Sequence, residues 1–202
     1  MSLLINTGVP SRIPGGMLES MFRLRREIFR DKLGWDVQTS DGMERDYFDE
    51  LPNVTYMIGS GETGEALACW RLLPTTGPYM LKSIFPELLH GQPAPQALDV
   101  WELSRFAVAT SRAGTGVAGF GPISMTLMKE SARFAIEHGI RRYVTVTTPP
   151  MERMLRQQGL HVHRFGPSIR IGVAVAVALV IEVDHQTLQA VGQQPVSFDI
   201  SG

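Results

Sequence analysis

The stretch Val100-Trp101-Glu102-Leu103-Ser104-Arg105-Phe106-Ala107-Val108 decides how the rest of this chain is organised. Its apolar and aromatic residues predict a β-strand, yet Glu102, Ser104 and Arg105 interrupt its centre. An unpaired charge is costly to bury, so these charged side chains need partners. In a regular strand Glu102 and Ser104 share one face and Arg105 lies on the other, so either both faces carry function or a bulge re-aims one side chain. The alternation by itself leaves both possibilities open.

Length and composition describe an ordinary globular protein. The chain has 202 residues, 44% of them hydrophobic, and 19 basic against 20 acidic residues give a net charge of -1. We expect one domain over residues 1–202 with a polar tail from about 192, and no nucleic-acid partner. Cys69 alone excludes an internal disulfide framework, and we find neither a signal peptide nor an apolar run that could span a membrane. A soluble cytoplasmic protein is expected.

Periodicity predicts the remaining elements. Apolar residues at helical spacing predict a helix over 17–33, and Arg25 lies at the edge of its apolar stripe, where a snorkelling side chain is the simplest interpretation. Strand-like runs at 54–60 and 66–73 flank a glycine-containing turn, which indicates a hairpin. A short helix over 81–89 precedes the opening stretch, and a long helix over 122–138 with Gly139 as its cap follows it.

The C-terminal part continues the alternation of strands and helices. We predict a strand over 143–148, a helix over 151–158, one long strand over 169–183 and a short helix capped by Asp184. This order predicts an α/β fold: a single-domain α-β-α sandwich with a mixed sheet and helices on both faces.

Several charges interrupt apolar segments and could share one site. Arg71 lies between Trp70 and Leu72, so it needs a carboxylate or a ligand. An acidic loop is usually solvated, but one mixed cluster would satisfy these charges together, and a zwitterionic substrate requires such a cluster. The charges in question are Arg25, Asp46, Asp49, Arg71, Glu102 and Arg105. We expect no metal site, because His161-Val162-His163 has too few companions.

A glycine-rich loop separates the opening strand from the long helix. A strand, such a loop and a helix N-terminus together favour anion binding. Acetyltransferases of the GNAT superfamily grip the pyrophosphate of acetyl-CoA with an Arg/Gln-x-x-Gly-x-Gly/Ala loop, and Arg112-Ala113-Gly114-Thr115-Gly116 is one residue short of that pattern. An N-acetyltransferase that uses acetyl-CoA and a non-catalytic small-molecule-binding regulator therefore remain alternatives.

Four runs in the same order carry a more specific resemblance. They are Arg25–Phe29 followed by Leu33-Gly34-Trp35, then Glu44-Arg45-Asp46-Tyr47-Phe48-Asp49, then Cys69–Leu81, and finally Trp101–Phe106. Over residues 17 to 183 the chain resembles the acyl-homoserine-lactone synthases, the LuxI-type autoinducer synthases of quorum-sensing bacteria. Cys69–Pro78 and Thr145-Val146-Thr147-Thr148 are most similar to the LasI branch, whose products carry long 3-oxoacyl chains.

The resemblance implies a GNAT-like acyltransferase fold and a two-step reaction. The amine of S-adenosylmethionine, a substrate and not a cofactor, takes an acyl group from acyl carrier protein, and its carboxylate then closes the lactone and expels 5'-methylthioadenosine. By motif position the resemblance assigns Glu102, Ser104 and Arg105 to catalysis, with Glu102 accepting the amine proton. Because it places Glu102 and Arg105 in one pocket, we predict that the strand bulges or splays near Ser104. It assigns S-adenosylmethionine binding to Arg25, Phe29, Trp35, Asp46, Asp49, Arg71 and Phe106, in which Phe29 and Trp35 would stack on the adenine or face the sulfonium.

The resemblance also implies an acyl pocket and a docking surface. The acyl pocket would lie between the sheet and the long helix, lined by Leu103, Phe106, Met125, Met128, Thr145, Thr147, Met154 and Leu155. A threonine at the place of Thr147 accompanies 3-oxo substrates in this family, although it is equally a plain β-branched strand residue. Docking of the acidic carrier protein would use Lys129, Arg133, Arg141, Arg142, Arg153 and Arg156, whose alternative is an ordinary solvated surface.

Overall fold

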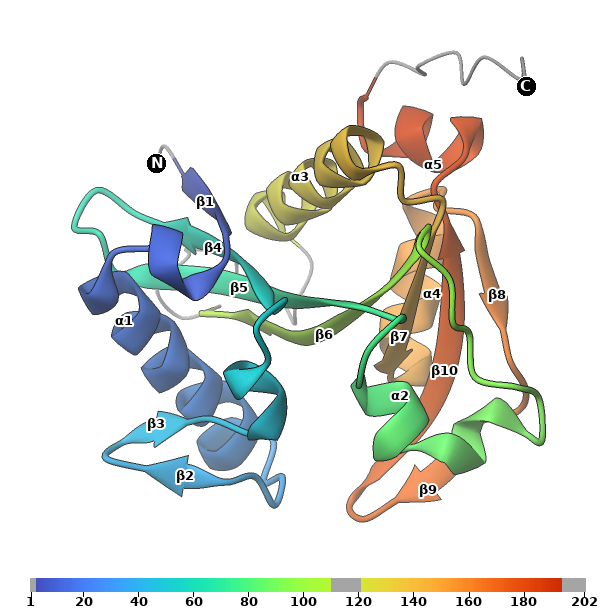
Figure 1. Ribbon diagram of the computed structural model, residues 1–202, viewed down its shortest axis with the longest axis horizontal. Coiled ribbons are helices and arrows are strands. Elements are labelled where there is room, and N and C mark those ends of the chain that lie inside the picture. The colour runs from blue at the N-terminus through green and yellow to red at the C-terminus, as the bar shows by residue number, and fades with distance from the viewer. Residues whose placement is uncertain (1–2, 110–120, 194–202) are drawn as a thin grey trace.

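One mixed sheet forms the middle of the fold, with strand order β1-β4-β5-β6-β7-β10-β8 and with β9 paired to β10. The computed structural model describes residues 3–109 and 121–193 (Figure 1). The strands are β1 Leu4–Gly8, β4 Thr55–Ser60, β5 Ala66–Pro74, β6 Val100–Val108, β7 Arg142–Thr147, β8 Val162–Arg164, β9 Ile169–Ile171 and β10 Ala174–Glu182. Within the described residues of this sheet, β6 and β7 pair in parallel and the other neighbours are antiparallel.

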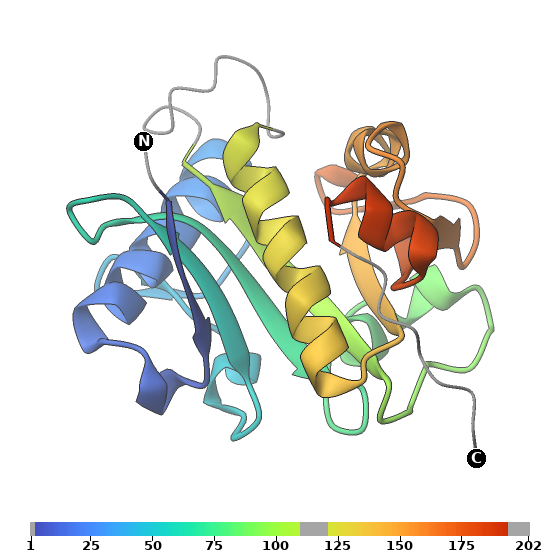
Figure 2. The same cartoon turned by 90° about the horizontal axis from the view of Figure 1, so that it is seen from above.

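Helices cover both faces of the sheet. One face carries α1 (Gly15–Arg26), whose last turn continues as a π-helix over Glu27–Lys32, and the short α2 (Met80–Ser83). The other face carries α3 (Pro122–His138), α4 (Pro149–Gln157) and α5 (His185–Ala190). Figure 2 shows α3 lying over the middle of the sheet. The predicted α-β-α sandwich with a mixed sheet is therefore confirmed.

Short elements lie between the main helices and strands. The two-stranded β2 (Thr39–Ser40) and β3 (Met43–Glu44) form a hairpin, and the single 3-10 turns are Pro10–Arg12, Tyr47–Glu50 and Pro86–Leu89. The turn over Tyr47–Glu50 begins with a capping box, in which Asp46 accepts a hydrogen bond from the Phe48 amide and Asp49 from the Asp46 amide. These local bonds fix the direction of both aspartate side chains.

β6 contains the bulge that its sequence predicts. In the pairing with β5, Cys69 is opposite Ala107 and Arg71 is opposite Ser104, so β6 holds one extra residue. Arg105 adopts the left-handed conformation with φ 56°, which costs a non-glycine residue about 1–2 kcal/mol. Pairing with β7 stops at Leu103, so the two parallel strands part where the bulge begins.

Local signals located several elements correctly. The hairpin of β4 and β5 is present, α3 has the predicted bounds, and Gly139 ends it in the left-handed conformation. Asp184 caps α5 by accepting a hydrogen bond from the Thr187 amide. The predicted helix over 17–33 exists as α1 and its π-helical extension.

Other predicted elements were wrong in their bounds. The single strand over 169–183 is instead the hairpin of β9 and β10, because Gly172 at φ 55° turns the chain and leaves Val173 exposed. The helix over 81–89 is two short helical turns, and β1 and β8 were not predicted. The glycine-rich loop Arg112–Gly116 lies outside the described residues, as does most of the polar tail. Among the described helices, none is long and apolar enough to cross a membrane.

The core side chains of β10 give a stability prediction. Leu179 is 0% exposed and pairs with both β7 and β8, so Leu179→Ala should lower the free energy of unfolding by about 2–5 kcal/mol. Urea denaturation measures this change. Leu4→Ala is the matched control, since Leu4 is 63% exposed and its truncation should have little effect. Equal effects of the two substitutions would contradict the assigned core.

Candidate active site

Six buried or half-buried ionic side chains meet on the α1 face of the sheet. We call this group the charge cluster: Arg25, Glu44, Asp46, Asp49, Arg71 and Arg105. They come from α1, β3, the turn that follows it, β5 and β6. Three guanidinium groups face three carboxylates, so the cluster is formally neutral, as burial of so many charges requires.

Arg25 is wholly buried, so its interpretation as a snorkelling side chain was wrong. Its Nε donates to Glu44 Oε2 at 2.5 Å, and its two terminal nitrogens donate to the two oxygens of Asp49 at 2.8 Å each. Burial alone would lower the pKa of Arg25, but the charges and hydrogen bonds of Asp49 and Glu44 outweigh it and hold that pKa well above its ordinary value. Arg25 therefore stays charged and ties α1 to the acidic turn.

Arg71 uses all of its donor groups. Its Nε donates to Ser104 Oγ at 3.1 Å, its Nη1 to Asp46 at 2.5 Å and Asp49 at 2.9 Å, and its Nη2 to Asp46 at 3.1 Å and the Met80 sulfur at 3.0 Å. Burial raises the pKa of Asp49, but the neighbouring Arg25 and Arg71 outweigh it, so that pKa lies far below its ordinary value. Asp49 thus stays a charged acceptor at any physiological pH.

Arg105 belongs to the charge cluster and also lies against the aromatic ring of Phe29. The bulge turns its side chain to the cluster, where Nε donates to Glu44 at 3.0 Å and Nη2 to Asp46 at 2.9 Å. Burial lowers the pKa of Arg105 relative to an exposed arginine. Its guanidinium lies 5.4 Å from the ring centre of Phe29, which stacks on Trp35 at 5.3 Å. The predicted aromatic pair therefore lies directly beside the charges.

Glu102 is close to the cluster but bonded differently. It is 1% exposed, and its two oxygens accept hydrogen bonds from the backbone amides of Met80 at 2.9 Å and Leu81 at 2.7 Å. Burial raises the pKa of Glu102 to about 7, against the lowering effect of those two amides. This carboxyl group can therefore exchange a proton near neutral pH.

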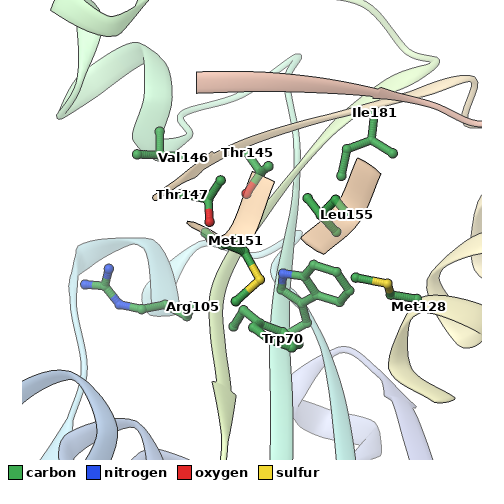
Figure 3. Close-up of a pocket in the computed structure, with 11 residues that line it drawn as sticks. Trp70, Arg105, Met128, Thr145, Val146, Thr147, Met151, Leu155 and Ile181 are labelled. Atoms are coloured by element: carbon green, nitrogen blue, oxygen red, sulfur yellow. The ribbon is translucent and has the colours of Figure 1, made fainter. Parts of the chain in front are cut away.

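An apolar pocket opens on the opposite side of the bulge. It is lined by Trp70, Ser104, Arg105, Phe106, Met128, Thr145, Val146, Thr147, Met151, Leu155 and Ile181. Figure 3 shows Trp70, Met151 and Leu155 gathered in its middle and Arg105 at its edge. Ser104 and Arg105 belong to both this pocket and the charge-cluster region, so the bulge of β6 connects an ionic site with an apolar one.

The pocket contains part of the predicted acyl lining. Met128, Thr145, Thr147 and Leu155 line it, as predicted. Leu103, Met125 and Met154 do not line the pocket. Leu103 is buried in the core under α3, and Met125 packs against that core. Met151 lines the pocket in place of Met154, because it lies one turn before Leu155 on α4. Phe106, predicted also to bind S-adenosylmethionine, contacts Trp70 in the pocket at 4.9 Å.

Sequence reasoning missed three residues of the charged site. Glu44 joins Arg25 to Arg105, Tyr56 donates its hydroxyl to Asp49 at 2.7 Å, and Met80 contacts two arginines. Glu44 belongs to the same acidic run as Asp46, so that run could have suggested it. Tyr56 and Met80 lie in ordinary apolar patterns, which gave no signal.

The six predicted docking residues are all exposed, but they differ in their partners. Arg133 pairs with Glu130 and Glu137, and Arg156 pairs with Glu152. Lys129, Arg142 and Arg153 make no ion pair to any residue in 3–109 or 121–193. Across the same ranges no three His, Cys, Asp or Glu side chains converge as metal ligands.

Glu44 provides a test of the cluster. Its side chain is 0% exposed and serves two arginines, so Glu44→Ala leaves their charges partly uncompensated and should lower the free energy of unfolding by about 3–5 kcal/mol. Chemical denaturation followed by circular dichroism measures the change. Glu62→Ala, at an exposed turn, should leave stability almost unchanged. A loss for Glu44→Ala no larger than for this control would show that the cluster does not depend on Glu44.

Known proteins are similar to this chain in both sequence and overall fold. The family model described as Autoinducer synthase matches residues 13–191. The acyl-homoserine-lactone synthase of Pseudomonas aeruginosa is 42% identical over 187 residues, which cover 92% of each chain. The crystal structure of the AHL synthase LasI superposes with a TM-score of 0.88 at 41% identity, covering 97% of this chain and 98% of that one.

Two further solved structures share the fold. TofI, solved in a ternary complex with an inhibitor and MTA, has a TM-score of 0.80 at 34% identity and covers 96% of this chain and 98% of its own. BjaI, described as a CoA-dependent acyl-homoserine lactone synthase and solved with SAM and isopentyl-CoA, has a TM-score of 0.82 at 23% identity, over 96% of this chain and 92% of its own. The chain belongs to the autoinducer synthase family and is an acyl-homoserine-lactone synthase, an acyltransferase of quorum sensing.

Proposed function

We propose that this synthase transfers a medium or long acyl group, 3-oxo in form, from acyl carrier protein to S-adenosylmethionine and lactonises the product. One observation carries the proposal: a neutral charge cluster and an apolar pocket meet at Ser104 and Arg105. A zwitterionic sulfonium substrate suits the first, and an acyl chain suits the second. Their junction is where an amine could reach a thioester.

The charge cluster and its aromatic neighbours suit S-adenosylmethionine. Arg71 and Arg105 provide positive charge for the substrate carboxylate, while Asp46 and Asp49 offset the guanidinium charges. The stacked Phe29 and Trp35 offer π-faces to the adenine or the sulfonium. TofI was solved with MTA and BjaI with SAM, and both complexes support this choice of substrate.

The reaction then needs one proton acceptor and no cofactor. The neutral amine attacks the thioester carbonyl, an amide bond forms, and the carrier thiolate leaves. A carboxylate oxygen next attacks the γ-carbon of the methionyl moiety, which breaks its bond to the sulfonium and releases 5'-methylthioadenosine. We assign the amine proton to Glu102, because burial gives it a pKa of about 7 and because β6 places it near Ser104 and Arg105.

The acyl chain would enter the apolar pocket. The apolar walls of the pocket are formed by Met128, Met151, Leu155 and Ile181. Strand β7 contributes the hydroxyl groups of Thr145 and Thr147. A hydroxyl donor at Thr147 can bond an oxygen at the third carbon of the acyl chain, which supports the 3-oxo assignment. A saturated chain offers no acceptor at that position.

Acyl carrier protein is proposed as the donor because of cationic side chains on α3 and α4, the two helices that also contribute residues to the apolar pocket. Arg153 on α4 and Lys129 on α3 are exposed and make no ion pair within the described ranges, as an acidic partner requires. Arg133 and Arg156 are already paired, so they contribute less. BjaI is CoA-dependent, so a CoA thioester is the other outcome of the donor test.

A cytoplasmic location accompanies these substrates, and the buried free thiol of Cys69 agrees with it.

A donor panel tests the proposal. The protein is incubated with S-adenosylmethionine and acyl thioesters of increasing length, saturated or 3-oxo, on carrier protein or on CoA. We expect 5'-methylthioadenosine and lactone by mass spectrometry in equal amounts, with the highest kcat/KM for a 3-oxoacyl carrier thioester. Arg153→Glu should raise KM for the carrier thioester and leave KM for a CoA thioester unchanged. Preference for CoA thioesters, or an equal response of both donors to Arg153→Glu, would reject the carrier assignment.

The proton-acceptor role predicts a pH profile. Glu102 accepts a proton only as a carboxylate, so its ionisation should make kcat/KM rise with pH up to about 7. The substrate amine adds its own rise near a pKa of about 7.7–8.0. In Glu102→Gln the rise in kcat/KM that Glu102 causes should vanish, and the rise that the substrate amine causes should remain. The value of kcat should fall by roughly 10²-fold or more. A folded Glu102→Gln variant with undiminished turnover would remove Glu102 from this role.

A further inference from the structure

Met80 occupies an unusual position at the start of α2. It is 6% exposed, and it follows Tyr79, whose backbone is extended. The Met80 amide donates to Glu102 Oε2 at 2.9 Å and the Leu81 amide to Glu102 Oε1 at 2.7 Å. Glu102 therefore determines where the chain enters this helix, and with it the position of the Met80 side chain.

The thioether of Met80 lies against two arginines of the charge cluster. Its sulfur accepts from Arg71 Nη2 at 3.0 Å and from Arg105 Nη1 at 3.5 Å. Two guanidinium groups repel each other, and one acceptor shared between them holds both in place. A thioether does this without charge, so the cluster keeps three positive and three negative groups.

The donor groups of Arg105 are unequally used. Its Nε and Nη2 donate to Glu44 and Asp46, whereas Nη1 meets only the weakly accepting Met80 sulfur among the described residues. Nη1 thus has hydrogen-bonding capacity left for a stronger acceptor. Arg105 also lines the pocket edge, so a substrate anion could reach this nitrogen. In Arg71, by contrast, both terminal nitrogens already bond carboxylates.

We infer that Met80 is a positioning residue for S-adenosylmethionine: its thioether aligns Arg71 and Arg105 so that Nη1 of Arg105 faces the substrate carboxylate. The inference rests on the proposed function, since it presumes that this carboxylate binds at the cluster. Met80 itself takes no part in the chemistry. Its loss should weaken binding of ligands that carry the carboxylate and leave other ligands unaffected.

Three variants and two ligands test this role. Met80→Leu keeps the apolar volume and removes the sulfur acceptor, Met80→Gln replaces it with an amide oxygen, and Met57→Leu makes the same chemical change in the core of the opposite face. Calorimetry gives Kd for S-adenosylmethionine and for 5'-methylthioadenosine, which lacks the amino-acid part. Steady-state assays give KM and kcat, and thermal unfolding checks each fold.

Met80→Leu should weaken S-adenosylmethionine binding roughly tenfold, in line with the loss of a hydrogen bond to a charged group, and should leave 5'-methylthioadenosine binding unchanged. Met80→Gln should recover part of the affinity. A role in apolar packing alone predicts the opposite order, because leucine suits a buried site better than glutamine. Met57→Leu should bind both ligands like the wild type.

The outcomes separate this inference from the proposed function. If the wild type makes lactone and Met80→Leu binds S-adenosylmethionine like Met57→Leu, the positioning role is wrong and the proposed function stands. Equal weakening for both ligands, or weaker binding by a folded Met80→Gln than by Met80→Leu, likewise overturns it. If Met80→Gln fails to fold, the comparison of the two leucine variants still decides. A wild type that neither binds S-adenosylmethionine nor releases 5'-methylthioadenosine overturns both.

Discussion

Neutralisation of three buried guanidinium groups is the constraint on which the rest of this structure depends. Arg25 and Arg71 are fully buried, and neither could lose its charge at an accessible pH. The carboxylates that meet them come from a hairpin and a turn between α1 and the sheet, so the ion pairs hold these connecting segments against the core. Aromatic rings lie within 5.2–5.4 Å of each of the three guanidinium groups and complete their surroundings.

Such a cluster is a poor way to gain stability. Buried ion pairs of this kind contribute little compared with apolar side chains of the same volume, and loss of one member is costly. The left-handed conformation of Arg105 adds further strain. Charges and strain that add so little to folding are better explained by the proposed substrate, whose sulfonium, amine and carboxylate need a polar site that is already organised.

The bulge of β6 gives one strand two functions. The extra residue lets Ser104 and Arg105 face the charge cluster, while Leu103 and Phe106 stay on the side of α3 and the pocket. The parting of β6 from β7 after Leu103 opens the pocket at the same point. Because a single backbone irregularity produces both effects, the two proposed substrates could meet at this one point of β6.

The sequence by itself determined the types of most helices and strands and the need to pair the charges in β5 and β6, since periodicity and burial cost are local arguments. Strand alternation, together with the shared site that the family motifs implied, also predicted the bulge. Its motifs also identified most of the cluster. Only the tertiary structure decided which groups pair. Helical spacing could not show that Arg25 points inward, because that depends on the Glu44 and Asp49 that the acidic turn brings to it. The choice of Met151 over Met154 follows from the rotation of α4 against the sheet, and the contacts of Met80 follow from where Glu102 fixes α2. These are long-range packing results, and no local pattern encodes them.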